Sequence, residues 1–118
     1  MRITGQNVRD ALIRALADEY SRKIILGTID RARSVEELSE TEKIPISTAY
    51  RRIKEMTEVG LLTVEKTIIT DEGKKFELYR SSFRSVRLQL TQGEIEVDVE
   101  LNEDVATRLS RLWASMRA

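Results

Sequence analysis

Two hydroxyl residues and an arginine stand at the start of one short amphipathic stretch, residues 44–62. Ser47 and Thr48 follow a proline, and their short side chains can approach a phosphate or a base edge closely. Arg51 lies about one helical turn further on, and a guanidinium can donate two hydrogen bonds to the two acceptors of guanine. These residue types in this order indicate a surface that contacts a phosphate-lined groove.

Three more side chains extend this candidate surface. Tyr50 and Lys54 project away from the apolar residues of the stretch, and a lysine suits phosphate, which positions a protein without reading sequence. Arg52 suits phosphate too, but it lies next to the apolar spine, where it could pair with an acid inside the domain. For Ser47 and Thr48 the alternative is plain helix capping. For the basic side chains the alternative is a solubilising role on a surface helix.

Composition excludes several kinds of site. The 118 residues contain no cysteine and no histidine, which excludes disulfides, thiolate and imidazole metal sites, and catalysis by a cysteine nucleophile or a histidine base. No phosphate loop or designed carboxylate pair is present, so we expect neither an enzyme nor a cofactor. No membrane span is expected, because the longest uncharged run is seven residues, 44–50. The first ten residues lack a signal-peptide core, which predicts a cytoplasmic protein.

Charge is balanced overall but segregated along the chain. Basic and acidic residues both number 20, so the net charge is zero. Residues 43–90 hold ten bases and six acids, whereas residues 91–104 hold six acids and no base. This distribution favours separate basic and acidic surfaces; the alternative is two solvated faces of a neutral protein. The acids at 94, 96, 98 and 100 alternate along one strand face, which spreads them rather than wrapping a hard cation such as calcium.

Hydrophobic periodicity predicts helices in the first half of the chain. A helix over about 7–20 has a stripe of Val8, Leu12 and Leu16, with Asn7 as its cap and Asp10 near its positive end. A second helix over about 21–32 is expected to bury Ile25, Leu26 and Ile29. Ser34 and Glu37 form a capping box for a short helix that buries Leu38. After Pro45 a further helix buries Ala49, Ile53 and Met56, and Gly60 stands where a left-handed C-cap belongs.

After Gly60 the period changes to that of strands. Residues 61–80 predict a hairpin with Gly73 in its turn. A second hairpin follows, and a two-residue turn at Gln92 and Gly93 fixes its register. That register pairs Leu90 with Ile95, Leu88 with Val97 and Val86 with Val99, and it places Arg87 opposite Asp98 on the outer face. A final helix is predicted after Asn102, which would cap it.

A helix, a short capped helix, a proline turn, a second helix and a hairpin make a tri-helical helix-turn-helix with a wing. Residues from about 21 to 80 resemble the winged-helix domain of prokaryotic transcription regulators, especially the ArsR-like branch common in archaea. The resemblance rests on Glu37 and Leu38, on "IPISTAYRRIKEM" and on "VGLL". It implies an α+β fold, with a recognition helix over about 46–59 in the major groove of double-stranded DNA. Metal sensing is not implied, because the cysteine and histidine ligands are missing.

The predicted wing offers further cations to DNA. Lys74, Lys75 and Lys66 could meet the flanking phosphates. Asp71 and Glu72 lie in the same turn and would be repelled by phosphate. These acids oppose contact between the wing and DNA, so contact through the helix is favoured over contact through the wing.

The chain is predicted to be one domain in three parts: an N-terminal helix (1–20), the winged helix-turn-helix (21–80), and a hairpin plus a C-terminal helix (81–118). The last helix has an apolar stripe, and we assign it to dimerisation through Val105, Leu109, Leu112, Trp113 and Met116. The alternative is that this helix only covers the apolar face of the second hairpin. A dimer would present two recognition helices to successive major grooves, about 34 Å apart.

The leading hypothesis is a sequence-specific, homodimeric DNA-binding transcription regulator. The alternative is a winged helix that contacts proteins inside a transcription or chromosome-maintenance complex, because fold alone does not decide function. The local excess of bases favours DNA, and the zero net charge and acidic second hairpin favour a protein partner. Binding of an effector ligand is a further alternative.

Overall fold

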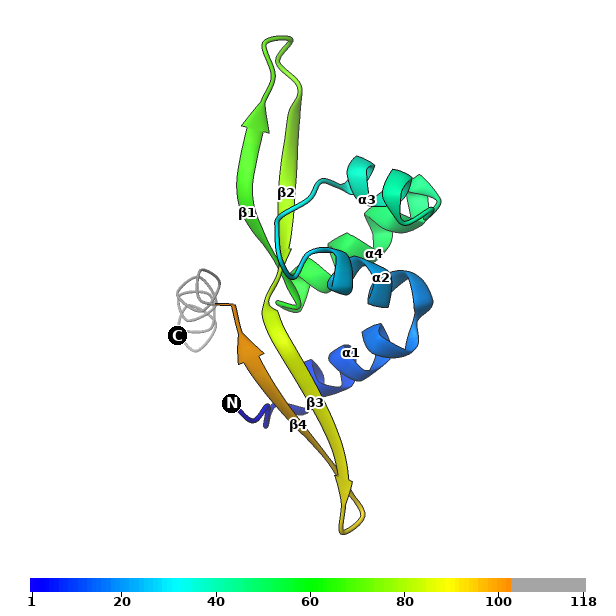
Figure 1. Ribbon diagram of the computed structural model, residues 1–118, viewed down its shortest axis with the longest axis vertical. Helices are drawn as coiled ribbons and strands as arrows, with labels where there is room; N and C mark the ends of the chain where they lie inside the picture. Colours follow the sequence, from blue (N-terminus) through cyan, green and yellow to red (C-terminus); the bar gives the residue numbers. More distant parts are fainter. Residues whose placement is uncertain (103–118) are drawn as a thin grey trace.

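The computed structural model describes residues 1–102, which form four helices followed by two antiparallel hairpins (Figure 1). The helices are α1 (Gln6–Ala17), α2 (Glu19–Gly27), α3 (Val35–Thr41) and α4 (Ile46–Glu58). The strands are β1 (Leu62–Ile69), β2 (Lys75–Ser81), β3 (Phe83–Thr91) and β4 (Glu94–Leu101). The predicted fold class, an α+β winged helix-turn-helix with an extra hairpin, is confirmed. The predicted final helix and the residues assigned to dimerisation lie outside the described residues.

The boundary between α1 and α2 differs from the prediction. The first helix begins after Gly5, so Asn7 lies inside its first turn and does not cap it. The second helix begins before residue 21, because Asp18 caps it. The Asp18 carboxylate accepts hydrogen bonds from the backbone nitrogen and the hydroxyl of Ser21, at 2.9 and 2.8 Å. This pairs one of the amides that the start of a helix leaves without a partner.

Helix α2 is shorter than predicted: Ile29 lies beyond its end and is half-buried, while Ile25 is buried as expected. Ile24 and Ile25 are buried, whereas Leu26, which we expected in the core, is 64% exposed. The helix ends at Gly27. The buried hydroxyl of Thr28 donates to the carbonyl oxygen of Ile24 at 2.8 Å and closes the last turn.

Helices α3 and α4 follow the prediction closely. The Ser34 hydroxyl accepts a hydrogen bond from the backbone nitrogen of Glu37 at 3.1 Å, so Ser34 is the cap of α3. The Glu37 side chain does not complete the capping box; it binds Arg31 and Arg33. The buried residues expected in these helices are Leu38, Ala49, Ile53 and Met56, and all four are buried. Gly60 has the expected positive φ of 83° after α4.

The first hairpin, β1–β2, forms the wing and is joined by an isolated β-bridge. Gly73 lies in its turn with a φ of 83°. Arg33, just before α3, pairs with Tyr79 of β2 through two backbone hydrogen bonds of 3.0 and 2.8 Å. These hydrogen bonds connect β2 of the wing to the segment that leads into α3. The periodicity of the sequence does not reveal this bridge.

The second hairpin, β3–β4, has the predicted register. Leu90 lies opposite Ile95, Leu88 opposite Val97, and Val86 opposite Val99. Gln92 and Gly93 form the turn with φ values of 49° and 78°, which is the left-handed pair that a type I′ turn requires.

Residues at the start of the chain add to the outer edge of β4. Ile3 donates its backbone hydrogen to the carbonyl oxygen of Val97 at 2.9 Å. Arg87 lies opposite Asp98 as predicted, but the cation that pairs with this acid is Arg2, at 3.5 Å. Arg2 also lies 3.1 Å from Glu96. The N-terminal segment thus neutralises part of the acidic face.

The two hairpins project in opposite directions from one junction, with the helices beside them (Figure 1). Ser82 is the one residue between β2 and β3, and it is buried with its hydroxyl donating to the carbonyl oxygen of Gly60 at 2.6 Å. The buried side-chain amide of Asn102 donates to the carbonyl oxygen of Ser81 at 2.7 Å. Buried polar groups that are paired in this way hold a chain in one arrangement.

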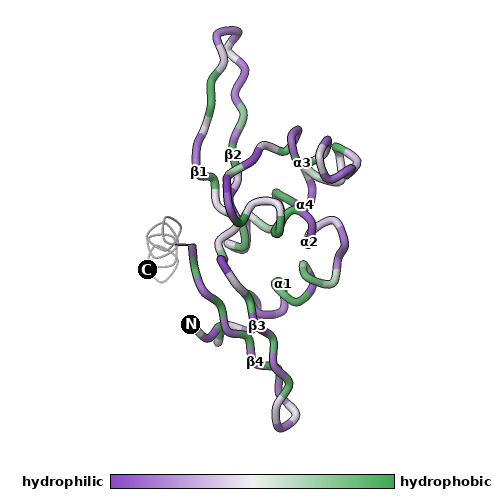
Figure 2. Tube along the Cα trace, viewed as in Figure 1, coloured by the Kyte–Doolittle hydropathy of each residue, from purple (hydrophilic) through white to green (hydrophobic). Residues whose placement is uncertain are grey.

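Within residues 1–102, the apolar face of the second hairpin is covered near the junction and exposed toward the turn. Hydrophobic and hydrophilic residues alternate along its strands (Figure 2). Val97 and Val99 belong to the core, with 0% and 3% of their surfaces exposed. Toward the turn, Leu88, Leu90 and Ile95 are exposed by 45%, 79% and 40%. We refer to these three residues as the apolar tip.

Candidate nucleic-acid interface

Four of the predicted side chains line one groove. Ser47, Tyr50, Arg51 and Lys54 lie along the exposed side of α4 and face an open groove of about 650 Å³ between this helix and the wing. Their spacing of three and four residues places them on one face of a helix. Tyr79 of β2 lines the same groove from the wing side.

The start of α4 has no side-chain cap. Pro45 is the N-cap residue and no side chain accepts a hydrogen bond there, so the capping alternative for Ser47 and Thr48 is wrong. Ser47 is exposed and Thr48 is half-buried outside the groove lining. The first helical hydrogen bond runs from the nitrogen of Ala49 to the oxygen of Pro45 at 2.9 Å. The amides before it lie at the positive end of the helix dipole, where anions are favoured.

The cations in the groove have no acidic partners. Among residues 1–102, neither Arg51 nor Lys54 forms an ion pair, and both are exposed. Other arginines of the same domain are neutralised: Arg33 lies 2.6 Å from Glu37, and Arg80 lies 2.9 Å from Glu65. The groove side of α4 therefore carries two cations without an ion pair, and Glu58, at the end of the helix, is the acid that lines the same groove.

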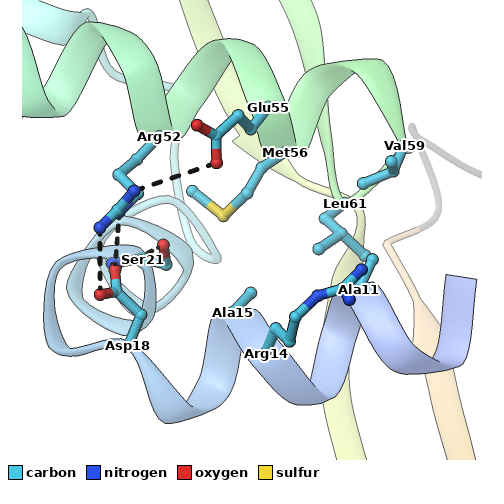
Figure 3. Close-up of a pocket in the computed structure, with 10 residues that line it drawn as sticks. All are labelled: Ala11, Arg14, Ala15, Asp18, Ser21, Arg52, Glu55, Met56, Val59 and Leu61. Carbon is cyan, nitrogen blue, oxygen red and sulfur yellow. Dashed lines mark hydrogen bonds and ion pairs between the residues drawn. The ribbon is translucent and has the colours of Figure 1, made fainter.

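Arg52 turns to the opposite side of the domain. Its Nε lies 3.0 Å from Oδ2 of Asp18, and its guanidinium reaches to 4.0 Å from Glu55 (Figure 3). The Ser21 hydrogen bonds, followed by the contact with Arg52, lower the pKa of Asp18 below its ordinary 3.8, against an opposing effect of burial. The structure does not bring Arg52 together with Arg51 and Lys54, and its role is the internal ion pair that we considered as the alternative.

Two tyrosines border the groove, and carboxylates hold both. The phenol of Tyr50 donates to Glu36 of α3, and this hydrogen bond, with burial, raises the pKa of Tyr50. Tyr79 donates to Oε2 of Glu77 at 3.0 Å. Burial, followed by that hydrogen bond, raises the pKa of Tyr79 to about 12. Both phenols are therefore neutral at physiological pH, and each donates its hydrogen to a neighbouring carboxylate. Tyr79 was not among the predicted residues.

The predicted wing lysines are exposed but do not share one face. Lys75 lies on the face of β2 that carries Tyr79, and with Tyr50 it lines a smaller hollow of about 250 Å³. Lys66 is paired across the hairpin with Leu78, which alternates with Tyr79, so Lys66 projects from the other face. Lys74 lies in the turn.

The acids of the wing turn are exposed as well. Asp71 and Glu72 lie beside Lys74 in the same turn, so the tip of the wing carries both signs of charge. Two further kinds of site are not found within residues 1–102. No three potential ligands among histidine, cysteine, aspartate and glutamate are grouped to hold a metal. No described helix has the length and hydrophobicity to cross a membrane.

Comparisons with known proteins agree with the helix-turn-helix. A family described as a helix-turn-helix domain matches residues 16–65, from the end of α1 into β1. The matched residues include all of α2, α3 and α4. Among solved structures, HlyU from Vibrio cholerae is similar over 94% of this chain and 97% of that chain, with 18% sequence identity and a TM-score of 0.45. No curated protein matches the chain.

Proposed function

We propose that the protein is a sequence-specific, double-stranded DNA-binding transcription regulator of the ArsR-like, archaeal type, cytoplasmic and homodimeric. The observation that carries the proposal is the exposed row on α4. Arg51 and Lys54, which have no acidic partner within residues 1–102, share a groove with Ser47 there. The helix that carries them occupies the second helix-turn-helix position of the matched region, which enters the major groove in such domains.

Each side chain has a separate proposed role. Arg51 reads a guanine through two hydrogen bonds, and Lys54 contacts a phosphate. Ser47 and Thr48, with the free amides at the start of α4, contact a backbone phosphate. Tyr50 packs at the edge of the same surface. Arg52 is left out of the contact surface, because it is engaged by Asp18.

The wing is proposed to contact phosphates beside the groove. Lys75, on the side that faces α4, and Lys74, in the turn, are the residues best placed for this contact. Lys66 lies on the other face of the hairpin. It would contact DNA only if the hairpin inserts into a groove with both of its faces beside phosphates. Asp71 and Glu72 would weaken contact at the extreme tip of the turn.

The homodimer is proposed to form through the C-terminal part of the chain. The stripe of Val105, Leu109, Leu112, Trp113 and Met116 is one element of this interface. The apolar tip is a second element, because three large, exposed apolar side chains on one face of the β3–β4 hairpin indicate an interaction site. Two copies related by a twofold axis would use the same patch on each. Their α4 helices would reach half-sites about 34 Å apart.

A protein-interaction module is the second candidate, and the acidic face of β4 is the observation that favours it. That face is less acidic than its sequence indicates, because Arg2 pairs with Glu96 and Asp98, and Arg84 pairs with Glu100 at 3.2 Å. The groove on α4 holds cations without partners, and this contrast favours DNA over a basic protein.

Binding to a mixed-sequence duplex at several salt concentrations tests the proposal. Each phosphate contact releases a counterion, so the association constant should fall steeply as salt rises. Lys54→Ala should reduce the slope by about one. An association that is absent, or that does not depend on salt, would contradict DNA binding and support the protein-interaction module.

A further inference from the structure

A second cleft lies on the other side of α4, away from the groove. It has a volume of about 340 Å³ and separates α1 from the C-terminal half of α4 (Figure 3). Its floor is apolar and buried, formed by Ala15, Met56 and Leu61, and Val59 stands at its rim with 40% of its surface exposed. Because Ala11 and Ala15 are small, α1 leaves this space open opposite Met56. The volume is in the range of pockets that hold small molecules.

The charges of this cleft are asymmetric. Four charged side chains line it, and three of them belong to one connected group: Asp18, Arg52 and Glu55. The fourth, Arg14, has no acidic partner among residues 1–102, and it extends along the cleft toward Leu61 (Figure 3). The connected group has two carboxylates and one guanidinium, so it carries one net negative charge. The cleft thus offers an apolar floor with the unpaired guanidinium of Arg14 at one side and the carboxylates of Asp18 and Glu55 beside Arg52.

We propose that this cleft binds a small molecule with a compact apolar body and one anionic group, such as an aryl carboxylate. The apolar body lies against Met56 and Leu61, and the carboxylate accepts hydrogen bonds from the guanidinium of Arg14. Such charge-assisted hydrogen bonds are stronger than neutral ones. The bound molecule contacts both α1 and α4. The proposal goes beyond DNA binding and does not depend on it.

The test uses the full chain labelled with ¹³C at the methionine methyl groups. The sequence has three methionines, so the signal of Met56 can be followed alone once Met56→Leu has assigned it. The probes are naphthylacetate and its neutral analogue naphthylacetamide, which have the same apolar body. We expect naphthylacetate to shift the Met56 signal in a saturable way, with an affinity about tenfold higher than that of the amide.

Variants locate the binding. Arg14→Gln, at an exposed position, should lower the affinity for naphthylacetate about tenfold and leave that for the amide unchanged. Arg84→Gln makes the same change on β3, outside the cleft lining, and should have no effect. Ala11→Leu should fill the cleft and abolish the binding of both probes. The proposal is overturned if the Met56 signal does not saturate, if acid and amide bind equally, or if Arg14→Gln has no effect.

Discussion

Asp18 and Arg52 join the end of α1 to the middle of α4, with Nε and Oδ2 3.0 Å apart. Asp18 also caps α2 through Ser21, so one carboxylate connects three helices. The pair fixes the position of α4 relative to α1 and α2, while Arg51, the residue just before Arg52, remains on the groove side.

The first prediction concerns the stability that this carboxylate supplies. Asp18→Asn keeps a capping oxygen but removes the charge, and it should lower the free energy of unfolding at neutral pH by up to about 1 kcal/mol. Asp18→Ala also removes the cap and should cost about 1 kcal/mol more. Urea titrations followed by circular dichroism measure both effects.

The pH dependence of stability follows from the lowered pKa. The folded-state pKa of Asp18 lies below its ordinary 3.8, so the carboxylate stabilises the fold above that value. The contribution is lost as the pH falls through the folded-state pKa. The free energy of unfolding should therefore differ less between about pH 7 and about pH 3 in Asp18→Asn than in the unmodified protein. Asp71→Asn, in the exposed wing turn, is the control; equal pH dependence in Asp18→Asn and the unmodified protein would contradict the account.

The cap of α3 provides a second prediction. Ser34→Ala removes the acceptor for the backbone nitrogen of Glu37 and should lower the free energy of unfolding by about 1 kcal/mol. Ser34→Asp retains an acceptor and should stay close to the unmodified protein. Ser85→Ala, at an exposed strand position, should change little. If Ser34→Ala and Ser34→Asp unfold at the same urea concentration, the cap does not contribute as described.

The apolar tip provides a third prediction, on the homodimer. Leu90→Lys places a charge where 79% of the side chain is exposed, so the monomer should fold normally. In a twofold dimer the charge would be buried twice, and the dissociation constant should rise at least about tenfold. Sedimentation equilibrium measures this constant. Gln89→Lys, on the other face of β3, is the control, and equal dimerisation of the two variants would exclude the tip from the interface.

Local patterns of the sequence were sufficient to predict much of this fold. The alternation along β3 and β4, with Gln92 and Gly93 between them, predicted the register from the turn to Val86 and Val99, because one face had to be apolar and the turn had to accept positive φ. The bulge between Phe83 and Ser85 was not predicted. The spacing of Ala49, Ile53 and Met56 likewise predicted the buried side of α4, and with it the exposed position of Arg51.

Contacts between distant residues could not be predicted in this way. Asp18 meets Arg52 34 residues later, and nothing in the neighbourhood of either residue specifies the other. Arg2 reaches Asp98 across almost the whole chain, and it takes the place that Arg87 was expected to fill. Tyr79 lines the groove from β2, where its backbone is bridged to Arg33, 46 positions earlier in the chain. These pairings arise from tertiary packing.

The central claim is that Arg51 reads DNA sequence while Arg52 does not. Selection of bound duplexes from a random pool, followed by affinity measurement at fixed moderate salt, tests it most directly. We predict that the protein recovers an inverted repeat. Arg51→Ala should weaken binding to that site by about 1–3 kcal/mol and relax specificity at one base pair, whereas Arg52→Ala, in a protein that remains folded, should keep the same sequence preference. Recovery of no sequence, or equal loss of preference in the two variants, would contradict the account.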